Sequence, residues 1–277
     1  MKFFPFILAN LFRKKTRTIL TVGSFAVALF LFGLLATIDT TFTGGVEVAG
    51  ADRLVVLNKS SLAQPLPFSY RDRILQIPGV KGVTFAVWFG GVYQNERNFI
   101  PIMAVDTDGF KEMYTEFAIA DEQWDAFVRD REGCFVGRST ATKYGWKIGD
   151  RVPIKGTIYP GVWEFNIRGI YDGTRAEDDT TQFWFQYGYL DERKQFLKGM
   201  VGWYMVRVVR PEDDIHVAAA IDQRFANSAY ETVAETEKSF LAGFVKQIGN
   251  IRLIIISVGS VVLFTLLLIT GSTMAMS

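Results

Sequence analysis

The stretch Leu253–Thr270, LIIISVGSVVLFTLLLIT, contains no charged residue. At the helical rise per residue, these positions would form a helix about 27 Å long, close to the hydrocarbon thickness of a bilayer. A second uncharged stretch, Thr18–Ile38 (TILTVGSFAVALFLFGLLATI), lies near the other end of the chain. It is longer than the apolar region of a signal peptide, and no clear small-residue cleavage site follows it. The sequence therefore predicts two transmembrane helices.

The charges around the first stretch predict its orientation. Residues 1–17 contain basic side chains and no acidic one, whereas the whole chain has 30 basic and 29 acidic side chains. Basic flanks mark the cytoplasmic side of a membrane, so we expect the amino terminus in the cytoplasm. The interfacial anchors are expected to be Arg13, Lys14, Lys15 and Arg17. They would lie among anionic headgroups, next to an amphipathic helix over residues 2–12.

These features divide the chain into four expected segments. They are a cytoplasmic amphipathic helix with its basic cluster (1–17), a first transmembrane helix (18–40), an extracytoplasmic domain (41–235), and a stalk with a second transmembrane helix (236–277). Cys134 is the only cysteine, so no disulfide can form within the chain. The domain must therefore be held together by an ordinary hydrophobic core, for which its length suffices.

Apolar and alternating patterns predict a mixed α and β domain. Expected strands are 53–57, 80–89, 98–105, 134–136, a strand from 151, 164–171, 181–190 and 203–209. Expected helices are 69–77, 110–117, 122–129, 139–144 and 213–227. Ser69 is expected to cap its helix, Pro101 is expected to place its strand at a sheet edge, and the final helix is expected to begin near Glu235.

Few residues suggest chemistry. No G-x-x-x-x-G-K-[ST] motif occurs, so this polypeptide is not expected to bind ATP in the usual P-loop way. The only histidine, His216, falls in a predicted helix, and there is no G-x-S-x-G motif; we expect no catalytic site. The acidic run 177–179 lacks the pattern of a calcium loop, which favours a solvated loop over a cation site. The aromatic residues 183–187 fit core packing better than a lipid or peptide groove. The net charge of +1 gives no reason to expect nucleic acid, and no cofactor or metal is expected.

Several segments resemble permease subunits of the MacB, FtsX and LolC/LolE type of ABC transporter. They are NLFRKKTRTILT (10–21), GADRLVVLNK (50–59), IPGVKGV (77–83), VGRSTATKYGWKIGDRVPIKG (136–156) and FNIRGIYD (165–172). The fourth is similar to a family segment written G-x-x-x-A-x-x-x-G-x-x-x-G-D-x-[VI]. The resemblance extends over essentially the whole chain, and its motifs are diffuse.

The resemblance implies an α+β fold: two transmembrane helices, of an expected four, flanking a large α/β periplasmic domain of MacB-like type. It implies a multi-pass inner-membrane subunit that relays ATP-driven conformational change from a separate ATPase, a mechanism called mechanotransmission (type VII). The implied partners are that ATPase, a second permease copy or paralogue, and a periplasmic adaptor or lipoprotein. The implied substrates are peptides, lipoproteins, lipids or drugs. Met276 and Ser277 would open the ATPase-coupling segment, and we expect the carboxyl-terminal part of the subunit to lie beyond them.

A receptor explains the same layout. A two-span receptor with an extracytoplasmic sensor domain would also have an amino-terminal anchor, a large outer domain and a returning helix. The amphipathic stretch 2–12 favours the permease, because a receptor needs no helix before its first span. A membrane-tethered periplasmic enzyme is disfavoured by the lack of catalytic groups.

Overall fold

The computed structural model describes residues 19, 22–23, 25–30, 32–34, 37, 52–176, 178–247, 253, 257–262 and 264–265. The chain divides into two compact units. We call Val48–Phe240 the folded unit, and Met1–Glu47 together with Leu241–Ser277 the apolar unit. The predicted anchors Arg13, Lys14, Lys15 and Arg17, and the predicted coupling residues Met276 and Ser277, lie outside the described residues.

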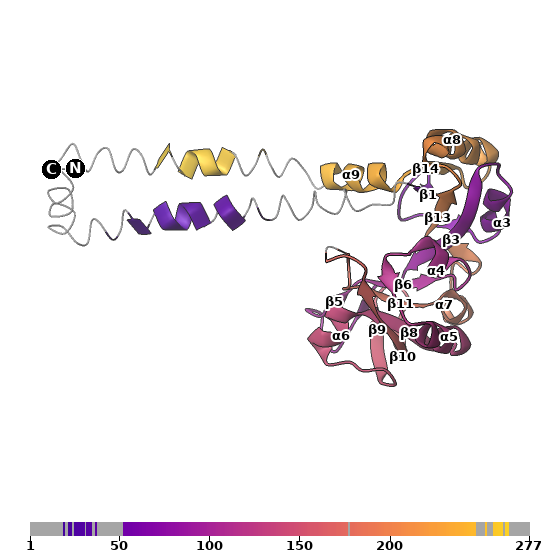
Figure 1. Cartoon of the computed structure of the whole chain (residues 1–277), viewed down its shortest axis with the longest axis horizontal. Coiled ribbons are helices and arrows are strands. Elements are labelled where there is room, and N and C mark those ends of the chain that lie inside the picture. Colours follow the sequence, from indigo (N-terminus) through magenta and orange to yellow (C-terminus); the bar gives the residue numbers. More distant parts are fainter. Residues whose placement is uncertain are drawn as a thin grey trace. The chain divides into compact units, whose positions relative to one another are not determined.

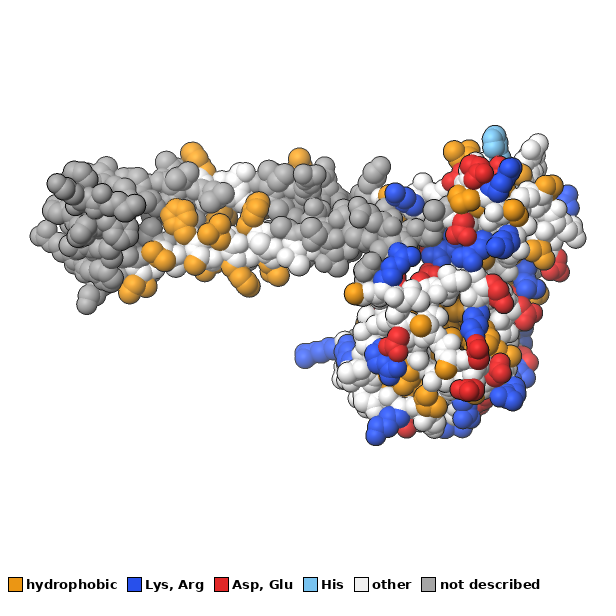
Figure 2. All heavy atoms as spheres, in the orientation of Figure 1, with side chains coloured by type: hydrophobic (Ala, Val, Ile, Leu, Met, Phe, Trp, Pro, Cys, Tyr) orange, Lys and Arg blue, Asp and Glu red, His pale blue; other side chains and the backbone are white. Residues whose placement is uncertain are grey.

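The described parts of the apolar unit are helical and largely exposed. Helix includes residues 25–30 and 257–262. A Cβ atom added to Gly259 would lie 3.2 Å from Cδ2 of Phe32, so the two uncharged stretches contact each other at this point. Figure 2 shows hydrophobic side chains over this unit and charged ones gathered over the folded unit. No helix among the described residues is both long and apolar enough to cross a membrane.

A four-stranded antiparallel sheet is built from the two ends of the folded unit (Figure 1). Its strands run in the order β14 (Thr232–Thr236), β1 (Arg53–Asn58), β13 (Trp203–Val208) and β3 (Val80–Trp88). Helices α3 (Tyr70–Leu75) and α8 (Asp214–Phe225) make the two connections, the second after a short 3₁₀ turn, Pro211–Asp213. This β-α-β-β-α-β order is that of a split βαβ motif. We call it the base.

The rest of the folded unit, residues 89–202, is inserted between β3 and β13, and we call it the inserted lobe. It continues the sheet beyond β3 in the order β6, β11, β8, β10, β9, β4 and β5. Its strands are β4 (Gly91–Val92), β5 (Phe99–Ile100), β6 (Ile102–Val105), β7 (Phe117–Ala118), β8 (Gly133–Gly137), β9 (Arg151–Gly156), β10 (Gly161–Gly173), β11 (Phe183–Gln186) and β12 (Met200–Val201). Its helices are α4 (Phe110–Met113), α5 (Asp121–Arg129), α6 (Arg138–Tyr144) and α7 (Tyr187–Arg193). A two-stranded sheet of β12 and β2 (Leu66–Pro67) ties the lobe to the base a second time.

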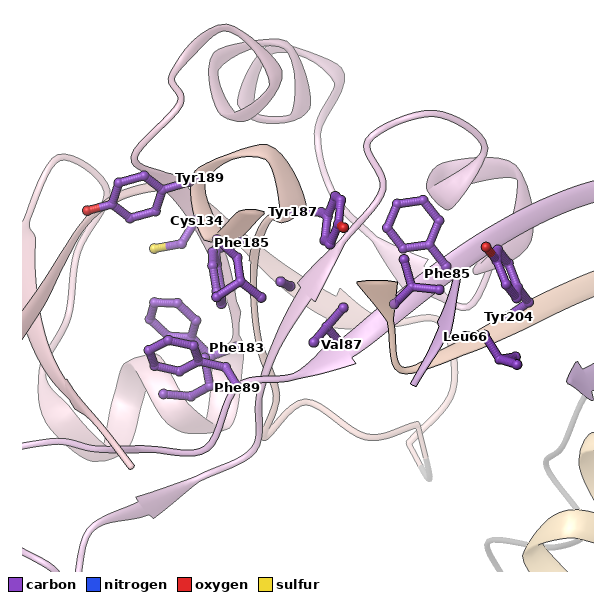
Figure 3. Packing of buried hydrophobic residues seen from close by; sticks show 14 of the residues in the cluster. Leu66, Phe85, Val87, Phe89, Cys134, Phe183, Phe185, Tyr187, Tyr189 and Tyr204 are labelled. Carbon is purple, nitrogen blue, oxygen red and sulfur yellow. The ribbon is translucent and has the colours of Figure 1, made fainter. Parts of the chain in front are cut away.

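Aromatic rings fill the main core, as Figure 3 shows. Phe89 lies edge-on to Phe185, with ring centroids 5.2 Å apart, and Phe165 lies 5.2 Å from Phe183. Edge-to-face pairs of this kind are favourable beyond the area they bury. Phe183 and Phe185 are fully buried and Trp184 is 3 % exposed. The prediction that the aromatic residues of segment 183–187 pack in the core is therefore confirmed.

Most predicted elements are present, with specific exceptions. The strand expected over 98–105 is broken at Pro101. Before the break, β5 is the last strand of the sheet order and lies at an edge as expected, whereas β6 after the break lies in the interior between β3 and β11. The strand expected over 181–190 ends at Gln186 and gives way to α7. Ser69 precedes α3 but makes no side-chain cap hydrogen bond.

The carboxyl-terminal part of the folded unit also differs from expectation. Not every apolar residue of the helix expected over 213–227 is buried: Ile215 is 75 % exposed, because the buried stripe is Val217, Ile221 and Phe225 at four-residue spacing. Strand β14 was not predicted, and α9 (Glu237–Gln247) begins two residues after the expected position.

The single cysteine gives a direct test of this core. Cys134 is fully buried in β8, and burial raises the pKa of its thiol well above the ordinary value, because the thiolate is disfavoured there. We expect no alkylation by iodoacetamide at pH 8 in the native full chain, and complete alkylation in urea. Mass spectrometry of the intact chain reads both states, and rapid labelling without urea would contradict the packing described here.

Candidate functional site at the Arg53 junction

The chain enters and leaves the base at the same end of the sheet. Strands β1 and β14 are antiparallel neighbours, and Leu54 lies opposite Thr236 in their register. Helix α9 starts at Glu237, directly after β14 and without an intervening linker. The hydroxyl of Thr236 accepts a hydrogen bond from the Ser239 amide at 3.1 Å, which is the contact of an N-cap residue. The helix is thus fixed to the last strand of the sheet.

Arg53 joins three segments at this point, and we call its contacts the Arg53 junction. Its side chain is only 5 % exposed. One terminal nitrogen lies 2.6 Å from Oε1 of Glu116, and Nε lies 2.7 Å from Oε2 of Glu237. The guanidinium also donates to the carbonyl of Met113 at 3.0 Å. Burial by itself lowers the pKa of Arg53, but the carboxylates of Glu237 and Glu116 outweigh it and raise that pKa above its ordinary value.

A second arginine supports the same place. Arg207 lies directly opposite Arg53 across the β1–β13 pair, and its Nε is 2.9 Å from Oδ2 of Asp52. It donates to the carbonyls of Glu112 and Met113, at the carboxyl end of α4. Carbonyls at a helix end have no partner within the helix, and cations near that end satisfy them. Two paired arginines therefore hold α4 onto the base.

Apolar groups shield the junction from water. The Tyr114 ring centroid lies 5.2 Å from the Arg53 guanidinium, and burial raises the pKa of the Tyr114 hydroxyl. A small cluster of Val55, Leu57, Met113 and Met205 packs beside it, with Phe240 of α9 against its side. Electrostatic attraction is stronger in such surroundings than in water, so loss of one partner would leave a costly unpaired charge.

The residues singled out from the sequence do not form a site. His216 is exposed on α8. Asp178 accepts hydrogen bonds from Thr174 and Arg175, and Asp179 accepts two from Thr181, so these acidic residues order their own loop. Within the part of the chain that the structure describes, no three His, Cys, Asp or Glu side chains are placed to hold a metal ion. The Arg53 junction was missed, although an arginine that opens an otherwise apolar strand is a signal for it.

The glycine-rich segment 137–152 is explained by backbone geometry. A Cβ atom at Gly137 would lie 2.0 Å from the carbonyl oxygen of Thr180. Gly145 ends α6 at a φ of +70°, and Gly149 has a φ of +97°, both in the region that favours glycine. The Asp150 carboxylate accepts the Lys147 amide at 2.8 Å and closes the turn. This segment is a strand–helix–turn–strand unit of the fold.

Fold and junction together define a class: a two-lobed α+β domain in which an ion pair joins the first residue of the entry strand β1 to the first residue of the exit helix α9. A family model described as the MacB-like periplasmic core domain matches residues 18–224, about three quarters of the chain. The chain belongs to this family, and the resemblance seen in the sequence is confirmed. None of the curated proteins compared with the chain matches it.

Several solved structures are similar to part of this chain. The periplasmic region of MacB from Actinobacillus actinomycetemcomitans is 9% identical in sequence and gives a TM-score of 0.50; the alignment covers 72% of this chain and 94% of the MacB region. The extracellular domain of the noncanonic ABC-type transporter YknZ from Gram-positive bacteria is 10% identical, with 66% and 100% coverage and a TM-score of 0.48. A domain of a putative permease protein from Porphyromonas gingivalis is 15% identical, with 66% and 88% coverage and a TM-score of 0.44.

Proposed function

We propose that the chain is a permease subunit of an ABC transporter, which relays ATP-driven conformational change from a separate ATPase to its folded unit. The two uncharged stretches act as transmembrane helices in the inner membrane, with a cytoplasmic amino terminus and with Arg13, Lys14, Lys15 and Arg17 at the inner interface. The folded unit lies in the periplasm. A second permease copy or paralogue completes the pair, and segments beginning near Met276 and Ser277 contact the ATPase. The work is export or extraction of a peptide, lipoprotein, lipid or drug, with a periplasmic adaptor or lipoprotein as a further partner.

One observation carries this proposal: α9 follows β14 without a linker. A movement of α9 along or about its axis must therefore move the sheet, because the Thr236 cap and the Glu237–Arg53 ion pair leave no flexible joint. A domain that only needed a membrane tether would work equally well on a flexible linker. The family to which the chain belongs supports the same reading.

The test compares hydrogen exchange in the assembled complex. The full chain is purified from its own membrane with the ATPase that co-elutes, and placed in nanodiscs. Amide exchange over residues 52–240 is expected to differ between ATP with vanadate and ADP. A Gly-Ser-Gly-Ser-Gly insertion between Thr236 and Glu237 should abolish that difference while ATP hydrolysis continues.

The matched control carries the same insertion between Asn95 and Glu96, in the exposed loop that joins β4 to β5. It should keep the nucleotide-dependent difference. Absence of co-eluting ATP hydrolysis, or a difference that survives the insertion before α9, would rule out the proposed relay.

A further inference from the structure

The Arg53 junction connects α9 not only to the base but also to the inserted lobe. Glu237 belongs to α9 and Arg53 to β1, whereas Glu116 and Met113 belong to the inserted lobe. The two carboxylates bind different nitrogens of one guanidinium, whose planar fork fixes their relative geometry. The lobe segment 113–116 is therefore held by a residue that also holds the first turn of α9.

From Glu116 the contacts continue into the longest strand of the lobe. The Glu116 carbonyl accepts the Thr174 amide at 3.0 Å, and β7 then pairs with the last residues of β10 through Ala118 opposite Asp172 and Phe117 opposite Gly173. Strand β10 has 13 residues, which at the rise of an extended strand gives about 40 Å. Its opposite end pairs with β9, where Gly161 lies opposite Gly156.

The far end of β10 carries exposed apolar side chains. Ile158, in the turn between β9 and β10, is 44 % exposed, and Val162 is 59 % exposed. An open groove of about 500 Å³ is lined by Val162 together with Val92, Pro153 and Lys155. A tilt of β10 at its Glu116 end would be passed to this hairpin through the strand itself, which pairs with β8 over Asn166–Tyr171 and with β9 over Gly161–Asn166, with an irregularity in the β8 pairing between Ile167 and Gly169.

We propose that Arg53 is the positioning residue that couples α9 to the inserted lobe, so that a displacement of α9 is passed through Glu116 to β10 and its hairpin. The role of this coupling in transport rests on the proposed function. The coupling itself is expected in the full chain without nucleotide or partner. It predicts that a change at α9 loosens a segment of the inserted lobe, and that the reverse change loosens α9. The test measures this coupling directly, from both of its ends.

The experiment uses the full chain in nanodiscs, without nucleotide or partner. Glu237→Gln should raise amide exchange in peptides covering residues 110–118 and 170–176 by at least about tenfold, since it removes one of the two carboxylates that hold Arg53. Reciprocally, Glu116→Gln should raise exchange in residues 238–241. In both variants exchange in β8, a buried strand of the same lobe, should stay unchanged.

The control is Glu231→Gln, which removes the exposed Lys59–Glu231 pair near the opposite end of β1 and β14. It should leave residues 110–118 unchanged. The inference is wrong if Glu237→Gln leaves these peptides unchanged, if Glu231→Gln affects them equally, or if exchange rises uniformly and includes β8. Should this coupling be found while the nucleotide-dependent difference above is absent, the proposed function fails and the role of Arg53 stands.

Discussion

Arg53→Met should lower the free energy of unfolding of the folded unit by about 3–5 kcal/mol, the usual cost of removing one partner from a buried ion pair. The substitution leaves Glu116 and Glu237 facing apolar neighbours with side chains only 19% and 16% exposed, so water cannot replace the lost guanidinium. The measurement is urea unfolding of the full chain in detergent, followed by tryptophan fluorescence. The signal is specific, because all six tryptophans lie between Trp88 and Trp203 in the folded unit.

Arg151→Met is the matched control. Arg151 also pairs with two carboxylates, those of Glu132 and Glu164, but it is 54% exposed. Water and salt screen such a pair, so its loss should shift the unfolding midpoint only slightly. Equal shifts for the two variants would show that burial of the Arg53 junction contributes nothing.

Gly137→Ala should destabilise the folded unit by about 3 kcal/mol, at the upper end of overpacking costs. The added methyl group would lie 2.0 Å from the Thr180 carbonyl oxygen, which is backbone and cannot rotate away. That carbonyl also accepts the Ser139 amide at 3.2 Å, so its displacement would disturb the start of α6. The same urea titration of the full chain measures the effect.

Gly188→Ala is the same substitution where space is available. Gly188 is exposed within α7, and nothing lies within 4 Å of a Cβ atom built there. Alanine is the better helix former by about 1 kcal/mol, so this variant should be as stable as the natural chain or slightly more stable. If Gly137→Ala unfolded at the same urea concentration as Gly188→Ala, the close approach to Thr180 would be refuted.

Local sequence patterns predicted the elements whose cause is local. The apolar run of β1, the helix expected over 69–77 and the strand–helix–turn of residues 134–150 all follow from periodicity and turn residues. The end of β11 does not, because Gln186 donates to the carbonyls of Phe127 and Asp130, at the distant end of α5. Aromatic propensity alone therefore extended the strand too far.

The partners of Arg53 could not be predicted from local pattern, although an arginine at the start of an apolar strand is itself a signal. Arg53 meets Glu116 and Glu237, which are 63 and 184 positions away along the chain. Strand β14 has only five residues and owes its strand conformation to pairing with β1, so it has little pattern of its own. The order of the strands brings these residues together, and that order is a property of the whole fold.

The place of the insertion has an evolutionary consequence. The inserted lobe leaves after β3 and returns into β13, and these strands are antiparallel neighbours with Ala86 opposite Trp203. Its two attachment points thus lie side by side. The four strands of the base, β14, β1, β13 and β3, pair with one another without any strand of the lobe between them. An insertion at this place can change in length or sequence without rebuilding the base. Diversity in such proteins should therefore concentrate between residues 89 and 202.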